Sequence, residues 1–235
     1  MQFKEAIQSF VDKGVVTPDE FALLEGAAKA RAFSVGGLTD KYALEVVKRS
    51  LETAIADGTP VNTWLTGIED TFEESGLTSL EEGAAHMRLV YRANVFGAYN
   101  AGRWTQQRRG KVARPYLQRI SAAHGLPEAE QVAANVRPEH ADADGTIRPV
   151  DDEYWTYSYP PMLNGEYEYN CRCMVVSVSQ AEMEAEGLDV TPDSDITVSP
   201  RGADAQDPAE EFFLGNDKVE TGQAGENAYR EFLED

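Results

Sequence analysis

The 235-residue sequence predicts an α+β protein. We expect a mainly helical N-terminal two-thirds with a long central helix, a small antiparallel β-containing C-terminal module, and an acidic, largely irregular tail. Two observations predict this order. Apolar residues recur at three- and four-residue steps up to about residue 107, which is helical periodicity. The most β-prone run lies just before residue 180, and the residues after it are rich in Asp, Pro, Ser and Gly.

Residues 1–80 form the predicted helical N-terminal region, which contains four helices. The first covers residues 3–12, and the second starts at Pro18 and breaks at residues 34–37. The third covers residues 40–57, and the fourth covers residues 60–75. Thr17 is the predicted N-cap of the second helix, and Glu20 completes a capping box with it. Thr39 is predicted to cap the third helix, which Gly58 ends because glycine tolerates a positive φ.

Residues 81–180 form the predicted core region, which opens with the longest helical pattern, from Ser79 to about Gln107. At 1.5 Å per residue such a helix spans roughly 40 Å. Gly97 and Gly102 lie within it, and a glycine inside a helix marks either close packing or a bend.

Charge is unevenly distributed along the chain, whose formal net charge is −20. Residues 83–127 contain eight Lys or Arg and no acid, whereas residues 180–235 hold 16 acids and 3 bases. The summed field disfavours general nucleic-acid binding because it repels phosphate. Three interpretations of the basic helix are open. It binds an acidic surface, either of another protein or of the chain's own tail; it contacts DNA phosphate; or it is a solvated helical face. We favour the acidic surface. The candidate partner-binding residues are Arg88, Arg92, Arg103, Arg108 and Arg109.

Residues 136–179 combine turn signals with β-prone residues. Asp144-Gly145 and Asn164-Gly165 are tight-turn signals, and Pro160-Pro161 cannot lie inside a central strand. Residues 146–150 are predicted to be extended. Residues 167–179 alternate in polarity, and residues 174–178 are the strongest strand signal in the chain.

The same stretch holds His140, Cys171 and Cys173, which carry the sharpest chemical hypothesis. Two thiolates on one strand face and an imidazole from a loop would suit Zn²⁺, with a fourth ligand from His124, a nearby Asp or water. The competing interpretation is two small buried thiols beside a strand and a hydrogen-bonded histidine. Because only three ligands are visible, the second interpretation carries more weight.

Several functional classes find no support in the sequence. It has no apolar run long enough for a transmembrane helix and no N-terminal export signal, which favours a protein made in the cytoplasm. Two cysteines at C-x-C spacing make no disulfide framework. There is also no GxxxxGK phosphate loop, no HExxH and no GxSxG.

Residues 181–235 form the predicted acidic tail. Residues 181–186 have the pattern of one or two helical turns, and residues 187–207 have the composition of a linker. Two short apolar stretches follow, at residues 210–214 and 224–233. Each is either a docking element or a modest packing patch, and both alternatives remain open.

A set of motifs, in order, resembles the phage head-morphogenesis proteins typified by the Mu protein F. The motifs are RLVYRANVFGAYNAGRW, VRPEHADADGTIRP, DDEYWTYSYPP and NCRCMV. The resemblance as a whole covers roughly residues 20–180. The set is specific, although each motif alone is weak. The signature positions that the resemblance implies are His140, Asp144, Gly145, Pro160, Pro161, Asn170, Cys171, Arg172 and Cys173.

The resemblance implies a structural, non-enzymatic minor head protein of a tailed phage. Such a protein acts in head morphogenesis, and in DNA packaging or delivery, at the capsid interior. The expected partners are the portal protein and the major capsid protein, with several copies at the portal vertex, no membrane and at most weak DNA contact. The competing class is a zinc-dependent hydrolase or toxin-like enzyme centred on His140, Cys171 and Cys173.

Overall fold

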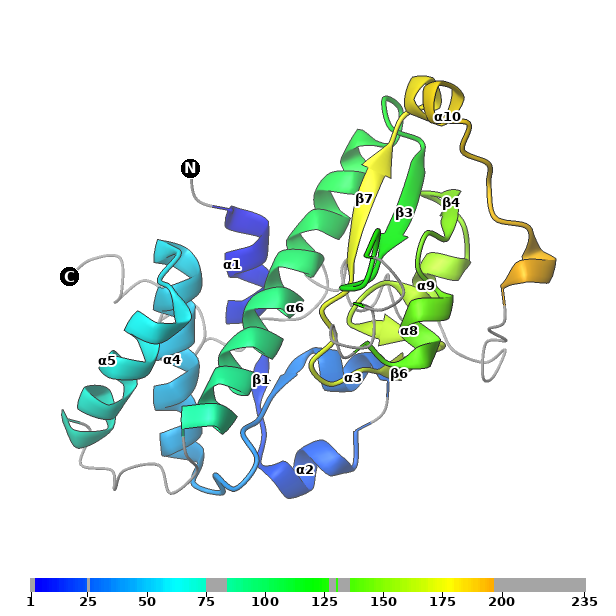
Figure 1. Ribbon diagram of the computed structural model, residues 1–235. Helices are drawn as coiled ribbons and strands as arrows, with labels where there is room; N and C mark the ends of the chain where they lie inside the picture. The colour runs from blue at the N-terminus through cyan, green and yellow to red at the C-terminus, as the bar shows by residue number, and fades with distance from the viewer. Residues whose placement is uncertain (1–2, 25, 75–83, 127–129, 131–135, 197–235) are drawn as a thin grey trace.

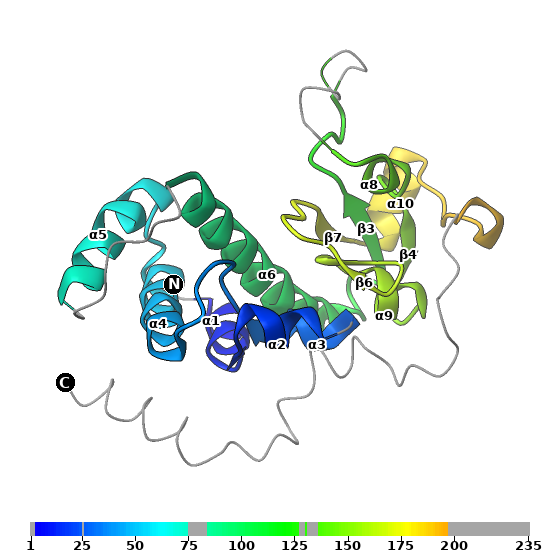
Figure 2. The same ribbon diagram turned by 90° about the horizontal axis from the view of Figure 1, so that it is seen from below.

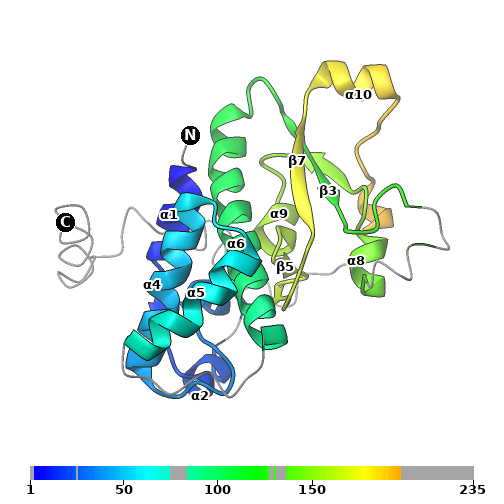
Figure 3. The same cartoon turned by 60° about the vertical axis from the view of Figure 1, so that its left-hand side comes forward.

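Helix α6 (Ala84–Gly110) lies between two groups of elements, as Figures 1 and 3 show. The computed structural model describes residues 3–24, 26–74, 84–126, 130 and 136–196. Helices α1, α4 and α5 pack on one side of α6, and the sheet with its short helices packs on the other. In the view from below, α4 and α5 lie on one side of α6 and the three-stranded sheet lies on the other, while α3 reaches across and contacts β6 of the second group (Figure 2). None of the helices in the described ranges is long and apolar enough to span a membrane.

The first group is helical and carries one small parallel strand pair. Its elements are α1 (Lys4–Val11), β1 (Gly14–Val15), α2 (Pro18–Ala22), α3 (Gly26–Ala30), β2 (Ala32–Phe33), α4 (Lys41–Asp57) and α5 (Val61–Glu74). The predicted capping box at Thr17 and Glu20 is present, and Gly58 ends α4 at a φ of 67°. The cap of α4 is Asp40 rather than Thr39, because the Asp40 carboxylate accepts from the Ala43 N–H.

The prediction of one helix from Pro18 to the 34–37 break is wrong. Helix α2 ends at Ala22, α3 is a separate short helix, and β2 then pairs in parallel with β1. The pairing buries Phe33 completely, with its ring edge-on to that of Phe10. Tertiary burial of this side chain therefore overrides the local helical periodicity.

The second group is built on a three-stranded antiparallel sheet in the order β4-β3-β7. Its elements are β3 (Tyr116–Ile120), α8 (Pro138–Asp142), β4 (Ile147–Pro149), α9 (Tyr154–Ser158), β5 (Met162–Leu163), β6 (Glu166–Tyr167), β7 (Met174–Val178), α10 (Gln180–Glu186) and the 3₁₀ turn η1 (Asp193–Asp195). The predicted strand at 174–178 and the extended piece at 146–150 are confirmed as β7 and β4. The central strand β3 was not predicted, because Gln118 and Arg119 interrupt its apolar pattern.

Turn chemistry in the second group follows the sequence. Asn164 and Gly165 have φ values of 60° and 79° and join β5 to β6 as a tight hairpin. Gly145 has a φ of 75° in the turn before β4. The Pro160-Pro161 bond is cis and lies between α9 and β5, outside any strand.

Helix α6 contributes to two separate hydrophobic cores. Its Met87, Val90 and Ala98 pack with residues of α1, α4 and α5. Its Ala101 and Trp104 pack in the second core, which also holds Leu117 of β3, Val175 of β7 and the aromatic residues of α9. The β-containing module therefore packs on the long basic helix.

Both outer edges of the described sheet are occupied. On the β7 side, the side chains of Asn100, Gln107 and Arg114 donate to the carbonyls of residues 173, 175 and 177. On the β4 side, Ile147 forms two hydrogen bonds with Thr191. The Thr191 N–H donates to the Ile147 carbonyl, and the Ile147 N–H donates to the Thr191 hydroxyl oxygen.

Three sequence predictions concern residues outside the described ranges. These are the helix start at Ser79 and the apolar stretches at 210–214 and 224–233. The predicted helix at 181–186 is confirmed as α10.

Two glycines of α6 are expected to respond oppositely to substitution. A Cβ at Gly102 would lie 2.7 Å from the Ala6 nitrogen and 2.7 Å from Cζ of Phe3, whereas a Cβ at Gly97 would meet nothing within 4 Å. We expect Gly102→Ala to lower the free energy of unfolding by about 1–3 kcal/mol through overpacking. Gly97→Ala should raise it by about 0.5–1 kcal/mol, because alanine loses less backbone entropy. Urea unfolding of both variants checks this, and a stabilised Gly102→Ala would contradict the close contact.

The helix α10 should contribute an acid-sensitive part of the stability. The Glu182 carboxylate accepts from the Ser179 N–H and hydroxyl and from Arg114, and these interactions lower its pKa to about 2. Because its folded pKa is depressed, Glu182 contributes stability above about pH 4.5, which is lost as the pH falls toward 2. Thermal melts should show a deficit for Glu182→Gln that is largest near pH 7 and shrinks in acid. Glu184→Gln, on the same helix, is the control and should show no such trend.

Candidate metal centre

His140, Cys171 and Cys173 meet in the second group of elements. Their ligand atoms all lie within 4.8 Å of one another, and the three residues are 4%, 7% and 2% exposed. His140 Nδ1 is 3.2 Å from Cys173 Sγ and 3.7 Å from Cys171 Sγ. The grouping of the three candidate ligands that the sequence predicted is therefore present.

Local backbone chemistry brings these residues together. Helix α8 starts after Arg137 with Pro138 as its first residue, which places His140 in the same first turn as the third residue. On the other side, Asn170 adopts a φ of 54°, and the Cys171 N–H bonds to the Glu168 carbonyl in a tight turn. The cysteines thus lie on the loop between β6 and β7, so the prediction that they share one strand face is wrong. The reason is this left-handed turn, which the alternating pattern does not reveal.

Glu168 and Arg137 hold the imidazole from its outer side. Glu168 Oε2 is 3.3 Å from His140 Nε2 and 2.7 Å from Arg137 Nη2, and that Arg137 nitrogen is also 3.0 Å from His140 Nε2. Two tautomers fit these contacts. Without a metal, Nε2 can accept from Arg137 while the Nδ1–H donates to Cys173; a metal at Nδ1 requires the other tautomer, in which Nε2–H donates to the Glu168 carboxylate and the Nδ1 lone pair faces both sulfurs. Carboxylates commonly fix metal-binding histidines in this way.

The two thiols differ in protonation. The thiol of Cys171 donates to Cys173, and this bond, together with His140 and Arg119, lowers the pKa of Cys173 to about 4. The same hydrogen bond and burial raise the pKa of Cys171. Of the two sulfurs, the deprotonated form is therefore favoured at Cys173, the one that approaches His140 most closely.

A buried arginine lies near the cysteines. Arg119 of β3 is fully buried, and its Nη1 donates to the carbonyls of Ser158 and Met162. Its Nε and Nη2 have no hydrogen-bond partner among the described residues. Its positive charge favours the deprotonated form of both cysteines, although burial and the hydrogen bond to Cys173 still raise the pKa of Cys171 overall.

The donor set fits a tetrahedral zinc ion. Zinc–sulfur bonds of about 2.3 Å and zinc–nitrogen bonds of about 2.0–2.1 Å place tetrahedral ligands roughly 3.5–3.8 Å apart. The observed nitrogen–sulfur distances of 3.2 and 3.7 Å need only small adjustments. A cavity of about 190 Å³, lined by all three residues together with Arg137, Asn170 and Arg172, adjoins them on one side. The group can thus hold a metal with three protein ligands.

The other signature residues lie around this group with separate roles. Asp144 accepts from the Ser121 N–H and pairs with His124 at 2.9 Å. His124 is thus paired with Asp144, and the described metal-binding group does not include it.

Two residues of the site, Glu168 and Arg119, were not predicted from the sequence. The spacing E-x-x-C could have pointed to Glu168, but nothing local marks Arg119 as buried.

The five arginines of α6 do not form one surface. Arg88, Arg92 and Arg103 fall within an arc of about 60° at 100° per residue. Arg108 packs over the Trp104 ring, and Arg109 pairs with Glu5 of α1 at 3.0 Å. The first three therefore share a face of the helix. Arg108 contacts a residue one turn earlier in α6, and Arg109 contacts α1.

Comparisons with known proteins agree with the sequence motifs. The family model described as Phage Mu protein F like protein matches residues 45–176, more than half of the chain. The chain is 29% identical over 203 residues to the putative capsid assembly protein F of Escherichia phage Mu, covering 80% of this chain and 43% of that protein. It is 26% identical over 207 residues to the Mu-like prophage FluMu F protein of Haemophilus influenzae, covering 84% and 44%.

The chain spans less than half the length of these two relatives. No solved structure matches it. The matched residues run from α4 to β7 and so include α6, His140 and both cysteines. The resemblance inferred from the motifs is confirmed, and the chain belongs to the Phage Mu protein F like family.

Proposed function

We propose that this chain acts in the assembly of the head of a tailed phage, as a structural component of the capsid interior. The observation that carries the proposal is the family match over residues 45–176, supported by a relative named for capsid assembly. Within that role we assign it to the portal vertex, in several copies, with the portal protein or the major capsid protein as its partner.

The face of α6 formed by Arg88, Arg92 and Arg103 is the proposed contact with that partner. Arg88 and Arg92 are exposed, and the helix carries no acid that could neutralise them. An acidic protein surface is the complementary partner, since charge pairs steer encounter and fix register. DNA is a weaker candidate, because the net charge of −20 repels phosphate at a distance.

Co-purification with the portal protein of the same phage tests this contact. The triple variant Arg88→Glu, Arg92→Glu and Arg103→Glu should recover at least tenfold less portal protein than the wild type. The control reverses the same number of charges on the exposed bases Lys4, Lys41 and Arg49, and it should recover wild-type amounts. Equal recovery by both triple variants would remove α6 from the interface.

The Cys-His cluster in this proposal has a structural role and carries no reaction. Each of its three ligands is more than nine-tenths buried. The adjoining cavity of about 190 Å³ is smaller than the roughly 300 Å³ at which ligand pockets usually begin. A zinc-dependent hydrolase needs a metal position that a substrate can reach. We therefore assign Zn²⁺ to this cluster as a structural ion that joins α8 to the loop before β7.

Metal analysis of the purified protein tests the zinc assignment. We expect one zinc per chain, and removal by a chelator should lower the melting temperature. Cys171→Ser and Cys173→Ser should each abolish zinc binding. Glu168→Gln should keep the fold but weaken zinc affinity about 10- to 100-fold, because it loosens the imidazole.

The control variant His124→Asn should bind zinc as the wild type does, since His124 lies outside the cluster. A folded protein that is free of zinc after growth and refolding in zinc would rule out the assignment. Hydrolysis by the zinc-loaded protein, absent from Cys173→Ser, would instead favour the enzyme.

A further inference from the structure

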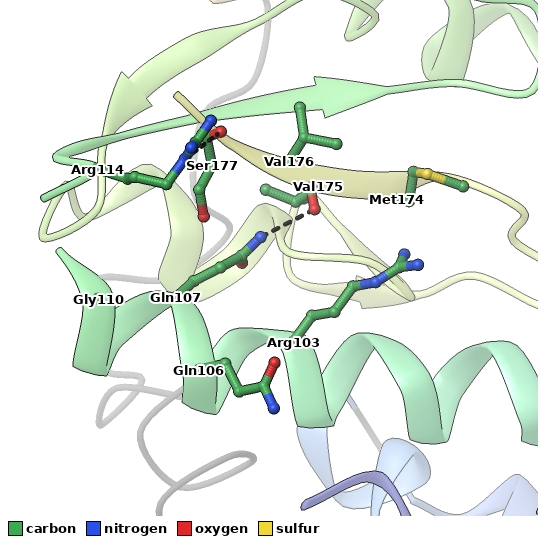
Figure 4. A pocket seen from close by; sticks show the side chains of 9 residues that line it. All are labelled: Arg103, Gln106, Gln107, Gly110, Arg114, Met174, Val175, Val176 and Ser177. Atoms are coloured by element: carbon green, nitrogen blue, oxygen red, sulfur yellow. Dashed lines mark hydrogen bonds between the residues drawn. The ribbon is translucent and has the colours of Figure 1, made fainter. Parts of the chain in front are cut away.

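A groove runs between the C-terminal half of α6 and the strand β7 (Figure 4). Its volume is about 400 Å³, twice that of the cavity beside the cysteines. Arg103 extends from α6 toward the strand, and Met174 and Val176 lie on the strand side of the groove. Arg114 stands at the other end. The groove thus combines two cations with an apolar wall.

Of the two arginines that line the groove, only Arg114 forms an ion pair within the described ranges. Arg114 is paired with Glu182 at 2.6 Å and donates to the Ser177 carbonyl. Arg103 has neither an ion pair nor a hydrogen bond within the described ranges, and no acidic residue lines the groove. Val176, on the strand side, is 37% exposed. One carboxylate and one apolar side chain would therefore complement the groove.

The groove does not admit an additional β-strand. The carbonyls of residues 173, 175 and 177, which face α6, already accept from Asn100, Gln107 and Arg114. Strand addition needs a free row of such groups. An occupant must therefore dock through its side chains, as an acidic and aromatic peptide would.

We propose that the occupant is the segment 210–214 of the same chain, with the sequence EEFFL. Residues 197–235 hold 10 acids and 3 bases, so this part of the chain complements the acid-free helix. Within it, residues 210–214 place two glutamates directly beside two phenylalanines. In the chain without its partner, a glutamate pairs with Arg103, and a phenylalanine covers Met174 and Val176. The partner of the proposed function would displace this segment when it takes up Arg103.

The chain is long enough for this contact. Ile196, the last described residue, packs against the second core, which contains Trp104 of α6 and Val175 of β7. Val175 also lines the groove. Position 210 lies fourteen residues after position 196, and an extended chain of that length reaches up to about 45–50 Å.

Photo-crosslinking of the full-length protein tests the proposal. A benzophenone amino acid replaces Val176 in one sample and Tyr42, an exposed residue of α4, in the control. After irradiation, mass spectrometry of the digested monomer band should find Val176 linked to the peptide that contains residues 210–214. The Tyr42 control should not give this link.

Charge variants identify the interaction. Arg103→Glu should reduce the Val176 link at least fivefold, and adding Glu210→Lys and Glu211→Lys to it should restore most of the yield. Because Arg103 makes no hydrogen bond among the described residues, its reversal should leave the fold intact, and circular dichroism checks this. Links only between chains would mean that a second copy fills the groove. That result, no link above the control, or a link insensitive to Arg103→Glu would each overturn the proposal.

Discussion

The structure depends on one helix that is packed on two opposite sides. Helix α6 gives Met87 and Val90 to the first core and Trp104 to the second. A helix used in this way cannot be simply amphipathic. Where the backbone of α1 comes near, α6 has Gly102, which leaves room for Ala6 and Phe3. Where it meets the edge of β7, it has the buried amides of Asn100 and Gln107, whose hydrogen bonds satisfy strand carbonyls.

The features predicted correctly are those determined by a few neighbouring residues. The capping box at Thr17, the turn at Asn164-Gly165 and the strand at 174–178 all depend on local backbone preferences. The features missed depend on distant contacts. Strand β3 exists because β4 and β7 pair on either side of it, and β2 exists because β1 lies beside it. These partner strands lie too far away in sequence to affect the local residue pattern of β3 or β2.

The candidate site shows the same division. The sequence contained the three ligand types at His140, Cys171 and Cys173, and folding does bring them together. It did not reveal the left-handed Asn170, which moves both cysteines off the strand. Nor did it reveal that Arg119 is buried near the thiolate, since a lone arginine in a short polar stretch ordinarily points to solvent. A buried cation without a carboxylate partner makes the charge balance of the site depend on its sulfurs.

The covered edges of the sheet limit how this module can associate. Asn100, Gln107 and Arg114 occupy the β7 edge, and Thr191 occupies the β4 edge. Copies crowded together therefore find no backbone template in this sheet on which to grow a continuous sheet from chain to chain. Association must use side-chain surfaces, whose strength ionic conditions can adjust. Assembly of the several copies proposed above would then not proceed by open-ended growth of this three-stranded sheet.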